Sequence, residues 1–176
     1  MIFVCAHGAG GHKDDRSMLA LDEALTGIGV QVVRFDFPYR EKGRKIPDPM
    51  PVLKSAIRDV ASQFPKAVIG GRSMGGRAAS MLAADGFACA GLLLFAYPLH
   101  PAGQLDKLRV GHFQEIRTPV LCFNGTRDAL CRRDLMEKYV PATWNMQWLE
   151  GADHSLKRGA DLEAIARETQ RWLATL

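Results

Sequence analysis

A serine between glycines, Ser73, has the setting of a catalytic nucleophile. It lies in Gly71-Arg72-Ser73-Met74-Gly75, which matches the pattern G-x-S-x-G. An apolar stretch, 67–70, precedes the serine, and a segment of helical character follows it. A sharp turn between a strand and a helix projects a serine hydroxyl out of a sheet. The pattern predicts a nucleophile at Ser73; the alternative is a glycine-rich phosphate-binding turn, although the G-K-[ST] of a P-loop is missing.

A serine hydroxyl needs a base to take its proton, and His154 is the best placed of the five histidines. Where a G-x-S-x-G turn carries the nucleophile, the triad follows the chain order serine, acid, histidine. His154 comes after the last expected strand and before the last expected helix, so a loop can bring its imidazole to the serine. The alternative is an ordinary histidine of a surface loop.

Asp128 is the expected acid of the triad. It follows the apolar stretch 120–123 in Asn124-Gly125-Thr126-Arg127-Asp128, where it can orient the imidazole and stabilise the imidazolium. Asp153 is a rival, but a side chain adjacent to His154 cannot easily accept its ring N–H. Asp134 falls inside an expected helix. The alternative for Asp128 is a helix-capping aspartate.

The glycine-rich run His7-Gly8-Ala9-Gly10-Gly11 follows the first expected strand and resembles the H-G-G-G loops of esterases. Small residues let a backbone approach a substrate closely. We expect the N–H groups of Ala9 and Met74 to form an oxyanion hole, with Gly8 in reserve for Ala9. We expect the ring of His7 to hold the loop rather than to act as a second base.

Three more residues follow expected strands and are candidates for substrate binding. Tyr39 comes after the second strand, and Tyr97 and His100 come after the fourth. We expect them to form two walls of a pocket; ordinary loop packing is the alternative. Arg77, one turn into the nucleophile helix, is expected to pack or to form a buried ion pair.

The elements that position these residues alternate between short apolar runs and segments of helical period, which is typical of a parallel α/β sheet. We expect three layers, with a doubly wound and mostly parallel six-stranded sheet between helices. The expected strands cover 2–6, 31–35, 67–70, 91–96, 120–123 and 145–149, and the expected helices lie near 18–28, 51–64, 74–86, 132–139 and 162–176.

Composition narrows the class of protein. The 176 residues fit one domain, 1–176, and a hydrophobic content of 47% argues against disorder. No apolar stretch approaches a membrane span, and the start lacks the features of a signal peptide, so we expect a cytoplasmic protein. The four cysteines form no zinc or C-x-x-C pattern and are read as reduced thiols. A net charge of +4 without a nucleic-acid motif argues against nucleic acid and membrane as partners.

Two long connections, 37–50 and 98–118, are too short to carry a lid with its own core. The sequence therefore predicts a minimal, lidless fold with a shallow site that favours short acyl groups.

Several motifs together resemble one family. These are the loop 7–11, the elbow Gly70-Gly71-Arg72-Ser73-Met74-Gly75-Gly76-Arg77, and the runs 35–39, 97–101 and 125–128. They look like the α/β-hydrolases related to subunit 3 of the NSL histone-acetyltransferase complex and to the testis-expressed hydrolase-like proteins, a group similar to dienelactone hydrolases. The resemblance implies the triad Ser73, Asp128 and His154, and a trimmed sheet with strand order 2-1-3-4-5-6.

Two departures from these relatives are visible. Dienelactone hydrolases use a cysteine nucleophile, whereas the elbow here carries Ser73, and a full α/β-hydrolase has two strands before the oxyanion loop. The reading is a serine hydrolase of a small carboxylic ester or thioester, acting through an acyl-enzyme without cofactor or metal, as a monomer or weak homodimer. Alternatives are a catalytically silent binding or scaffold protein with this fold, and cleavage of amides or peptides.

Overall fold

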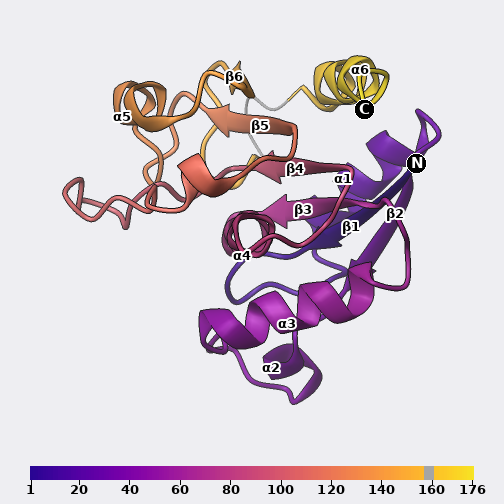
Figure 1. The fold of residues 1–176 in the computed structure, drawn as a ribbon. Helices are drawn as coiled ribbons and strands as arrows, with labels where there is room; N and C mark the ends of the chain where they lie inside the picture. The colour runs from indigo at the N-terminus through magenta and orange to yellow at the C-terminus, as the bar shows by residue number, and fades with distance from the viewer. Residues whose placement is uncertain (157–160) are drawn as a thin grey trace.

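The computed structural model describes residues 1–156 and 161–176 and contains a six-stranded sheet between two layers of helices (Figure 1). All strand pairs among these residues are parallel, in the order β2-β1-β3-β4-β5-β6. The expected fold class and strand order are therefore confirmed. The strands are β1 (Ile2–Ala6), β2 (Gln31–Phe35), β3 (Val68–Arg72), β4 (Gly91–Phe95), β5 (Val120–Gly125) and β6 (Trp144–Leu149).

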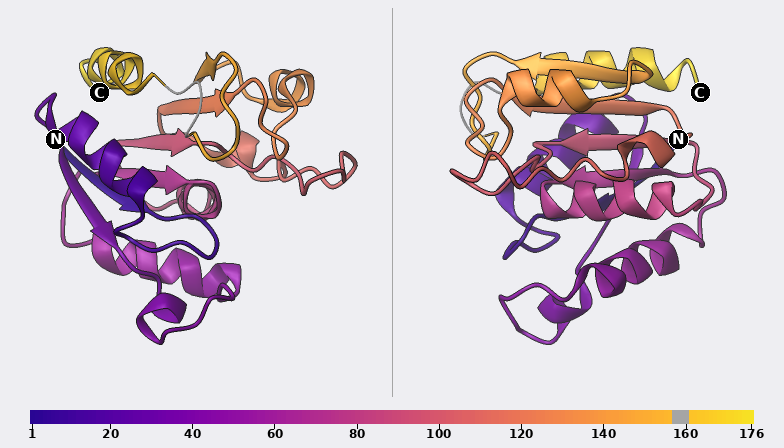
Figure 2. Two further views of the ribbon diagram at one scale, coloured as in Figure 1. Left: turned by 180° about the vertical axis from the view of Figure 1, so that it is seen from behind. Right: turned by 60° about the vertical axis from the view of Figure 1, so that its left-hand side comes forward.

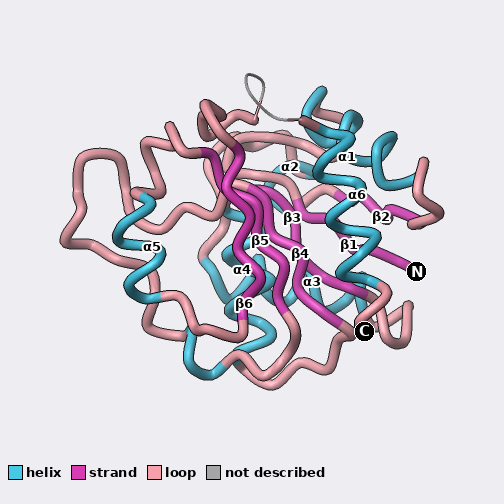
Figure 3. The backbone as a smooth tube through the Cα atoms, turned by 90° about the horizontal axis from the view of Figure 1, so that it is seen from above, coloured by secondary structure: helices cyan, strands magenta, loops and turns pink. Residues whose placement is uncertain are grey.

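The helices divide between the two faces of the sheet. On one face lie α3 (Met50–Ala61), α4 (Met74–Ala84) and α5 (Arg133–Tyr139); on the other lie α1 (Arg16–Thr26) and α6 (Leu162–Leu173). Two further views show the sheet between the helices (Figure 2). The view from above shows α5 on the opposite side from α1 and α6 (Figure 3).

Strand β4 is apolar throughout, and β5 is apolar apart from Asn124, because both faces of these strands are covered. Every residue of β4 is buried, and so is every residue of β5. Side chains alternate between the faces of a strand, so a strand covered on both sides needs a continuous apolar run. Each Å² of apolar surface that such a run buries stabilises the fold by about 25 cal/mol. The strands β4 and β5 therefore form the centre of the core.

Proline or aspartate residues occupy the starts of three helices. Proline occupies the first turn of α3, where its missing N–H leaves no helical bond unmade. The carboxylate of Asp161 accepts a hydrogen bond from Ala164 N at 2.9 Å and caps α6. Asp15 occupies the N-cap position of α1, but its carboxylate accepts a hydrogen bond from His12 N instead of capping the helix.

The two long connections contain little regular structure. A short helix, α2 (Pro38–Glu41), and a 3-10 turn, η1 (Phe113–Glu115), are the elements described within them, and neither was expected from the sequence. Neither is long enough to form a lid with a core of its own. No helix in the described part of the chain is long and apolar enough to cross a membrane.

The strand order creates a switch point between β1 and β3. The chain moves from β1 to β2 on one side and then crosses to β3 on the other. In parallel sheets the loops that leave such neighbouring strands diverge and open a crevice at the carboxyl ends. The glycine-rich loop after β1 and the elbow after β3 meet at this place.

Candidate active site

Ser73 occupies the turn between β3 and α4 in a strained backbone conformation. Its φ of 51° and ψ of −118° lie in a region that non-glycine residues rarely adopt. A Cβ atom on Gly71 would lie 2.1 Å from the carbonyl oxygen of Ala6, and one on Gly75 would lie 2.5 Å from the same oxygen. The two glycines are therefore needed because the elbow packs directly against the end of β1, a contact that the motif alone does not reveal.

His154 contacts the serine directly. The Ser73 hydroxyl and the Nε2 atom of His154 are 2.8 Å apart. The Nδ1 atom lies 2.8 and 2.9 Å from the two carboxylate oxygens of Asp128. With the Nδ1 proton donated to the carboxylate, Nε2 presents its lone pair to the serine hydroxyl, which is the tautomer that a general base requires. The structure thus brings together the three residues that the sequence singled out.

Asp128 is held in place by the protein backbone and by Asn124. The side chain of Asp128 is fully buried, and its Oδ1 atom accepts a hydrogen bond from Leu130 N at 2.8 Å. The Asn124 side-chain amide lies 3.4 Å from Oδ2 and also bonds to both backbone groups of Tyr97. Asn124 was missed by sequence reasoning. The signal in the sequence that could have found it is an asparagine directly after the apolar run 120–123.

The acid loop and the histidine loop are joined by backbone contacts. Thr126 N donates to Leu149 O, and Arg127 N donates to Ala152 O, both at 3.0 Å. A Cβ atom on Gly125 would lie 2.1 Å from the Ala152 carbonyl oxygen. These contacts fix the separation between the aspartate and the histidine.

The rival acid Asp153 turns back onto its own loop. Its Oδ1 atom accepts hydrogen bonds from the backbone N–H and the hydroxyl of Ser155. The carboxylate that contacts the imidazole of His154 is that of Asp128.

The loop after β1 lies next to the serine. A Cβ atom on Gly8 would be 3.5 Å from Ser73 Cβ, which is van der Waals contact, so the loop and the nucleophile are direct neighbours. The amides of Ala9 and Met74 donate to no acceptor among the described residues. Met74 is the first residue of α4, where the helix dipole favours negative charge. An oxyanion hole formed by these two amides stays a prediction.

His7 holds this loop. It is fully buried; its Nδ1 atom donates to Gly8 O at 2.8 Å, and its Nε2 atom accepts from Phe37 N at 3.3 Å. Burial lowers the pKa of His7, so its ring stays neutral and serves both contacts. The expected structural role agrees with this geometry.

Arg72 is a further residue of the site to which the sequence assigned no role. Its guanidinium donates to the carbonyl oxygen of His154 at 2.9 Å and lies 3.8 Å from the position that a Gly8 Cβ would occupy. It therefore stands between the histidine loop and the glycine-rich loop. Burial lowers the pKa of Arg72, whereas the charges of Asp15, Asp128 and Asp153 act in the opposite direction.

The three candidate pocket residues lie in the interior. Tyr39 is fully buried and packs against His7 and Phe37. Tyr97 is fully buried, and its hydroxyl donates to Arg109 O at 3.0 Å. His100 is 2% exposed, and both ring nitrogens contact backbone groups. None of the three offers an accessible surface to a substrate in this structure, because all three are buried; the hydroxyl of Tyr39 has no hydrogen-bond partner among the described residues.

Arg77 does not form the buried ion pair that was one of its two expected roles. No carboxylate among the described residues forms an ion pair with it, and its buried Nε atom has no hydrogen-bond partner there. No group of three or more His, Cys, Asp or Glu side chains in that part of the chain is arranged to hold a metal ion.

Comparison with known proteins agrees with this fold. In solved structures the chain is similar to Est1E from Butyrivibrio proteoclasticus, determined with ferulic acid bound, with a TM-score of 0.79, 17% identity, and 99% of this chain and 88% of that chain covered. It is also similar to a dienelactone hydrolase from Anabaena variabilis (TM-score 0.77, 18% identity, 99% and 85% covered). A predicted CIB-like hydrolase from Thermoplasma acidophilum gives a TM-score of 0.75, with 22% identity and 99% and 86% covered.

At these identities the structural likeness shows the fold. A family model for the alpha/beta hydrolase domain matches residues 1–172, which is nearly the whole chain. On this match, with the fold and strand order described above, the chain belongs to the alpha/beta hydrolase domain family.

Proposed function

We propose that the protein is a serine hydrolase that cleaves a small carboxylic ester or thioester through an acyl-enzyme on Ser73. The observation that carries the proposal is the continuous contact from the Ser73 hydroxyl through the His154 ring to the Asp128 carboxylate, at 2.8 Å in each step. Similarity in fold to the dienelactone hydrolase from Anabaena variabilis, a hydrolase by name, supports the same broad class of reaction.

The proposed reaction has two halves. His154 Nε2 takes the Ser73 proton while the oxygen attacks the carbonyl carbon, and the amides of Ala9 and Met74 stabilise the oxyanion. The bond to the leaving group then breaks, and the imidazolium returns its proton to the departing alcohol or thiol. Water, deprotonated by the same imidazole, releases the acid and restores the serine.

The site favours short acyl groups in this proposal. Neither long connection forms a lid, and the side chain of His154 is 25% exposed. An open site buries few methylene groups, each worth about 0.8 kcal/mol when fully buried.

Activity toward p-nitrophenyl acetate and butyrate tests the proposal. We expect turnover by the wild-type protein, and the variants Ser73→Ala and His154→Ala should lower kcat by about 10⁴ or more. Asp153→Asn serves as the matched carboxylate control and should stay close to wild type, because Asp128 is the acid in contact with the ring. Turnover that survives Ser73→Ala would place the reaction elsewhere, and a folded protein inactive on every ester would favour the scaffold function.

The proposal also includes a narrower family relationship, a location in the cell and an oligomeric state. The motifs support kinship with the hydrolases related to subunit 3 of the NSL complex and the testis-expressed hydrolase-like proteins. We further propose a cytoplasmic protein that acts as a monomer or weak homodimer on a small-molecule ester.

A further inference from the structure

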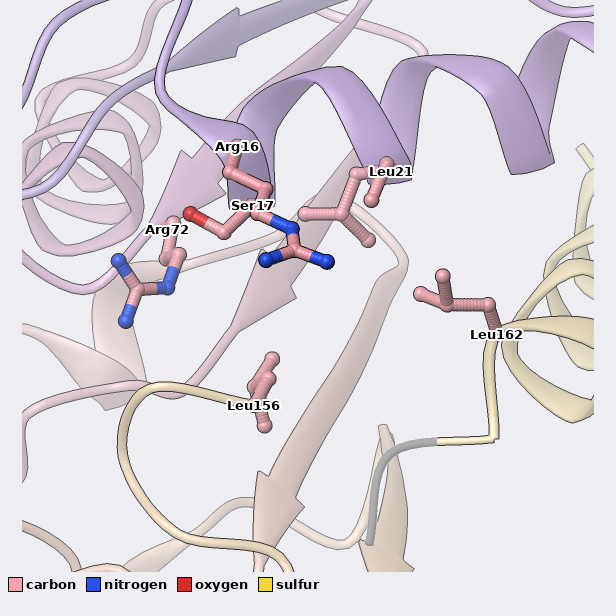
Figure 4. A pocket seen from close by; sticks show the side chains of 7 residues that line it. Arg16, Ser17, Leu21, Arg72, Leu156 and Leu162 are labelled. Atoms are coloured by element: carbon pink, nitrogen blue, oxygen red, sulfur yellow. The ribbon is translucent and has the colours of Figure 1, made fainter. Parts of the chain in front are cut away.

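A cavity of about 300 Å³ lies between α1, the end of β3, Leu156 and the start of α6. Figure 4 shows the side chains that line it. Ser73 and His154 are not among them, but two lining residues are their close neighbours in sequence, since Arg72 precedes the serine and Leu156 follows the histidine by two positions. The cavity is thus adjacent to the triad without including it.

Arg72 brings an incompletely paired positive charge to this cavity. A guanidinium has five N–H donors, and the one hydrogen bond found for Arg72 among the described residues goes to His154 O. Its Nε atom is buried without a partner, and no carboxylate in the described part of the chain lies within ion-pair distance. The charges of Asp15, Asp128 and Asp153 act on Arg72 without forming an ion pair with it among the described residues, so they offset only part of its desolvation cost, and a bound anion in direct contact offsets more.

A second cation and a hydroxyl stand opposite, at the start of α1. Arg16 and Ser17 both line the cavity, and neither forms an ion pair or side-chain hydrogen bond with a described residue. The first turn of α1 contains no acidic residue, and no side chain caps it. Asp15 at the N-cap places a carboxylate at this end of the 11-residue helix that opposes the helix dipole, so the positive charge at the cavity comes from the two arginines.

The remaining wall of the cavity is apolar. Leu21, Leu156 and Leu162 lie on one side of the cavity in Figure 4, while Arg72 and the Ser17 hydroxyl face each other on the other. No carboxylate among the described residues lines the cavity. A ligand that matches these walls has a compact anionic head and a short hydrocarbon segment.

The geometry points to a binding site for a small phosphate monoester, with the phosphate between Arg16, Arg72 and the Ser17 hydroxyl and the alkyl part against the three leucines. Phosphate fits better than carboxylate because donors approach from two elements and the two guanidinium groups match a charge of about −2. The phosphate site does not depend on the proposed hydrolase activity. Arg72 nevertheless connects a bound phosphate monoester to the loop that carries His154, because its guanidinium donates to the His154 carbonyl oxygen.

Calorimetric titration with n-butyl phosphate tests the site. The titration uses the full chain as wild type and as Ser73→Ala, which separates binding from turnover. We expect one saturable site in both proteins. Inorganic phosphate should bind at least about threefold more weakly because it leaves the leucines uncovered, and pentanoate should bind at least about tenfold more weakly because it has one oxygen and about one charge fewer.

Variants at the start of α1 locate the binding. Arg16→Gln combined with Ser17→Ala should weaken butyl phosphate at least about tenfold, since both side chains donate to the phosphate. Arg58→Gln is the matched control because it removes the same charge from an exposed position on α3 and should leave the affinity unchanged. The site would be overturned if butyl phosphate did not saturate the wild-type protein at 20 mM, a concentration that corresponds to a binding free energy on the order of 2 kcal/mol. Equal affinity of the wild-type protein and the double variant for butyl phosphate, or tighter binding of pentanoate than of butyl phosphate, would also overturn it.

Discussion

At the scale of single residues, Asn124 links Asp128 to the segment that contains Tyr97. Its side chain bonds to both backbone groups of Tyr97 and approaches Asp128. We predict that Asn124→Ala lowers stability by about 2–4 kcal/mol, because two buried backbone groups lose their partners. It should also lower kcat about tenfold with KM nearly unchanged, because Asp128 loses a neighbour that holds it.

Asn145→Ala is the control for this prediction, since Asn145 is exposed on β6. Urea unfolding and ester kinetics measure the two effects. If Asn124→Ala were as stable and as active as Asn145→Ala, the contacts of Asn124 would contribute neither to stability nor to the position of Asp128.

His112 makes stability depend on pH. Its Nε2 atom lies 2.8 Å from the Ser80 hydroxyl, and burial together with the nearby charge of Arg77 lowers its pKa to about 4. The unfolded chain takes up this proton near pH 6.5 and the folded chain near pH 4. The contribution of the neutral His112 to the free energy of unfolding is therefore fully present above about pH 6.5 and is lost as the pH falls from 6.5 to 4.

We predict that the unfolding free energy of wild type falls between these pH values by on the order of 1 kcal/mol more than that of His112→Asn, after allowance for solvent screening. Urea unfolding at pH 7.5, 6, 5 and 4.5 measures the difference. Parallel pH profiles for the two proteins would refute the assignment.

Sequence reasoning at this scale named the residues with intrinsic chemistry and overlooked their supports. Ser73, His154 and Asp128 carry a motif or a chain order that can be read locally. The contacts of Asn124 and Arg72 join segments distant in sequence, which spacing does not reveal. Tyr39, Tyr97 and His100 were expected at a pocket because they follow strands, but burial depends on how the next loop folds back over them.

At the scale of elements, the junction of β1 with β3 carries the elbow, and Gly71 is its closest contact. A Cβ atom there would approach Ala6 O to 2.1 Å and Ala6 N to 2.6 Å. Because both atoms are backbone, the strands would have to separate. We predict that Gly71→Ala destabilises the protein by more than about 4 kcal/mol or prevents folding.

Gly111→Ala provides the comparison, since no atom lies within 4 Å of the corresponding Cβ position. It should change stability by less than about 1 kcal/mol. Thermal and urea unfolding of both variants test this pair, and a Gly71→Ala protein of wild-type stability would contradict the close packing.

The arrangement of elements was predictable because apolar runs and helical periods alternate along the chain, and the crossover rule limits the topology. Strand ends were less predictable. The third strand extends to Arg72 rather than residue 70, and the fifth to Gly125 rather than residue 123, because backbone pairing continues past the last apolar side chain. Helix α2 depends on packing of Tyr39 against His7, which no local pattern shows.

At the scale of the whole molecule, the absence of a lid among the described residues sets the preference for substrate length. We predict that kcat/KM for p-nitrophenyl esters is highest between about two and six acyl carbons, because longer chains bury little further surface at about 0.8 kcal/mol per methylene. Detergent micelles should give no activation. A steady rise through ten carbons, or a jump above the micellar threshold, would reveal an acyl tunnel or a lid.

Covalent labelling of Ser73 is the most direct test of the central claim that its hydroxyl is an activated nucleophile. A fluorophosphonate probe should label the wild-type protein once, and mass spectrometry should place the adduct on Ser73, whose hydroxyl lies 2.8 Å from the imidazole. Ser73→Ala should not react, and His154→Ala should react at least about 10²-fold more slowly. Folded wild-type protein that stays unlabelled, or that is labelled on another serine, would contradict the account.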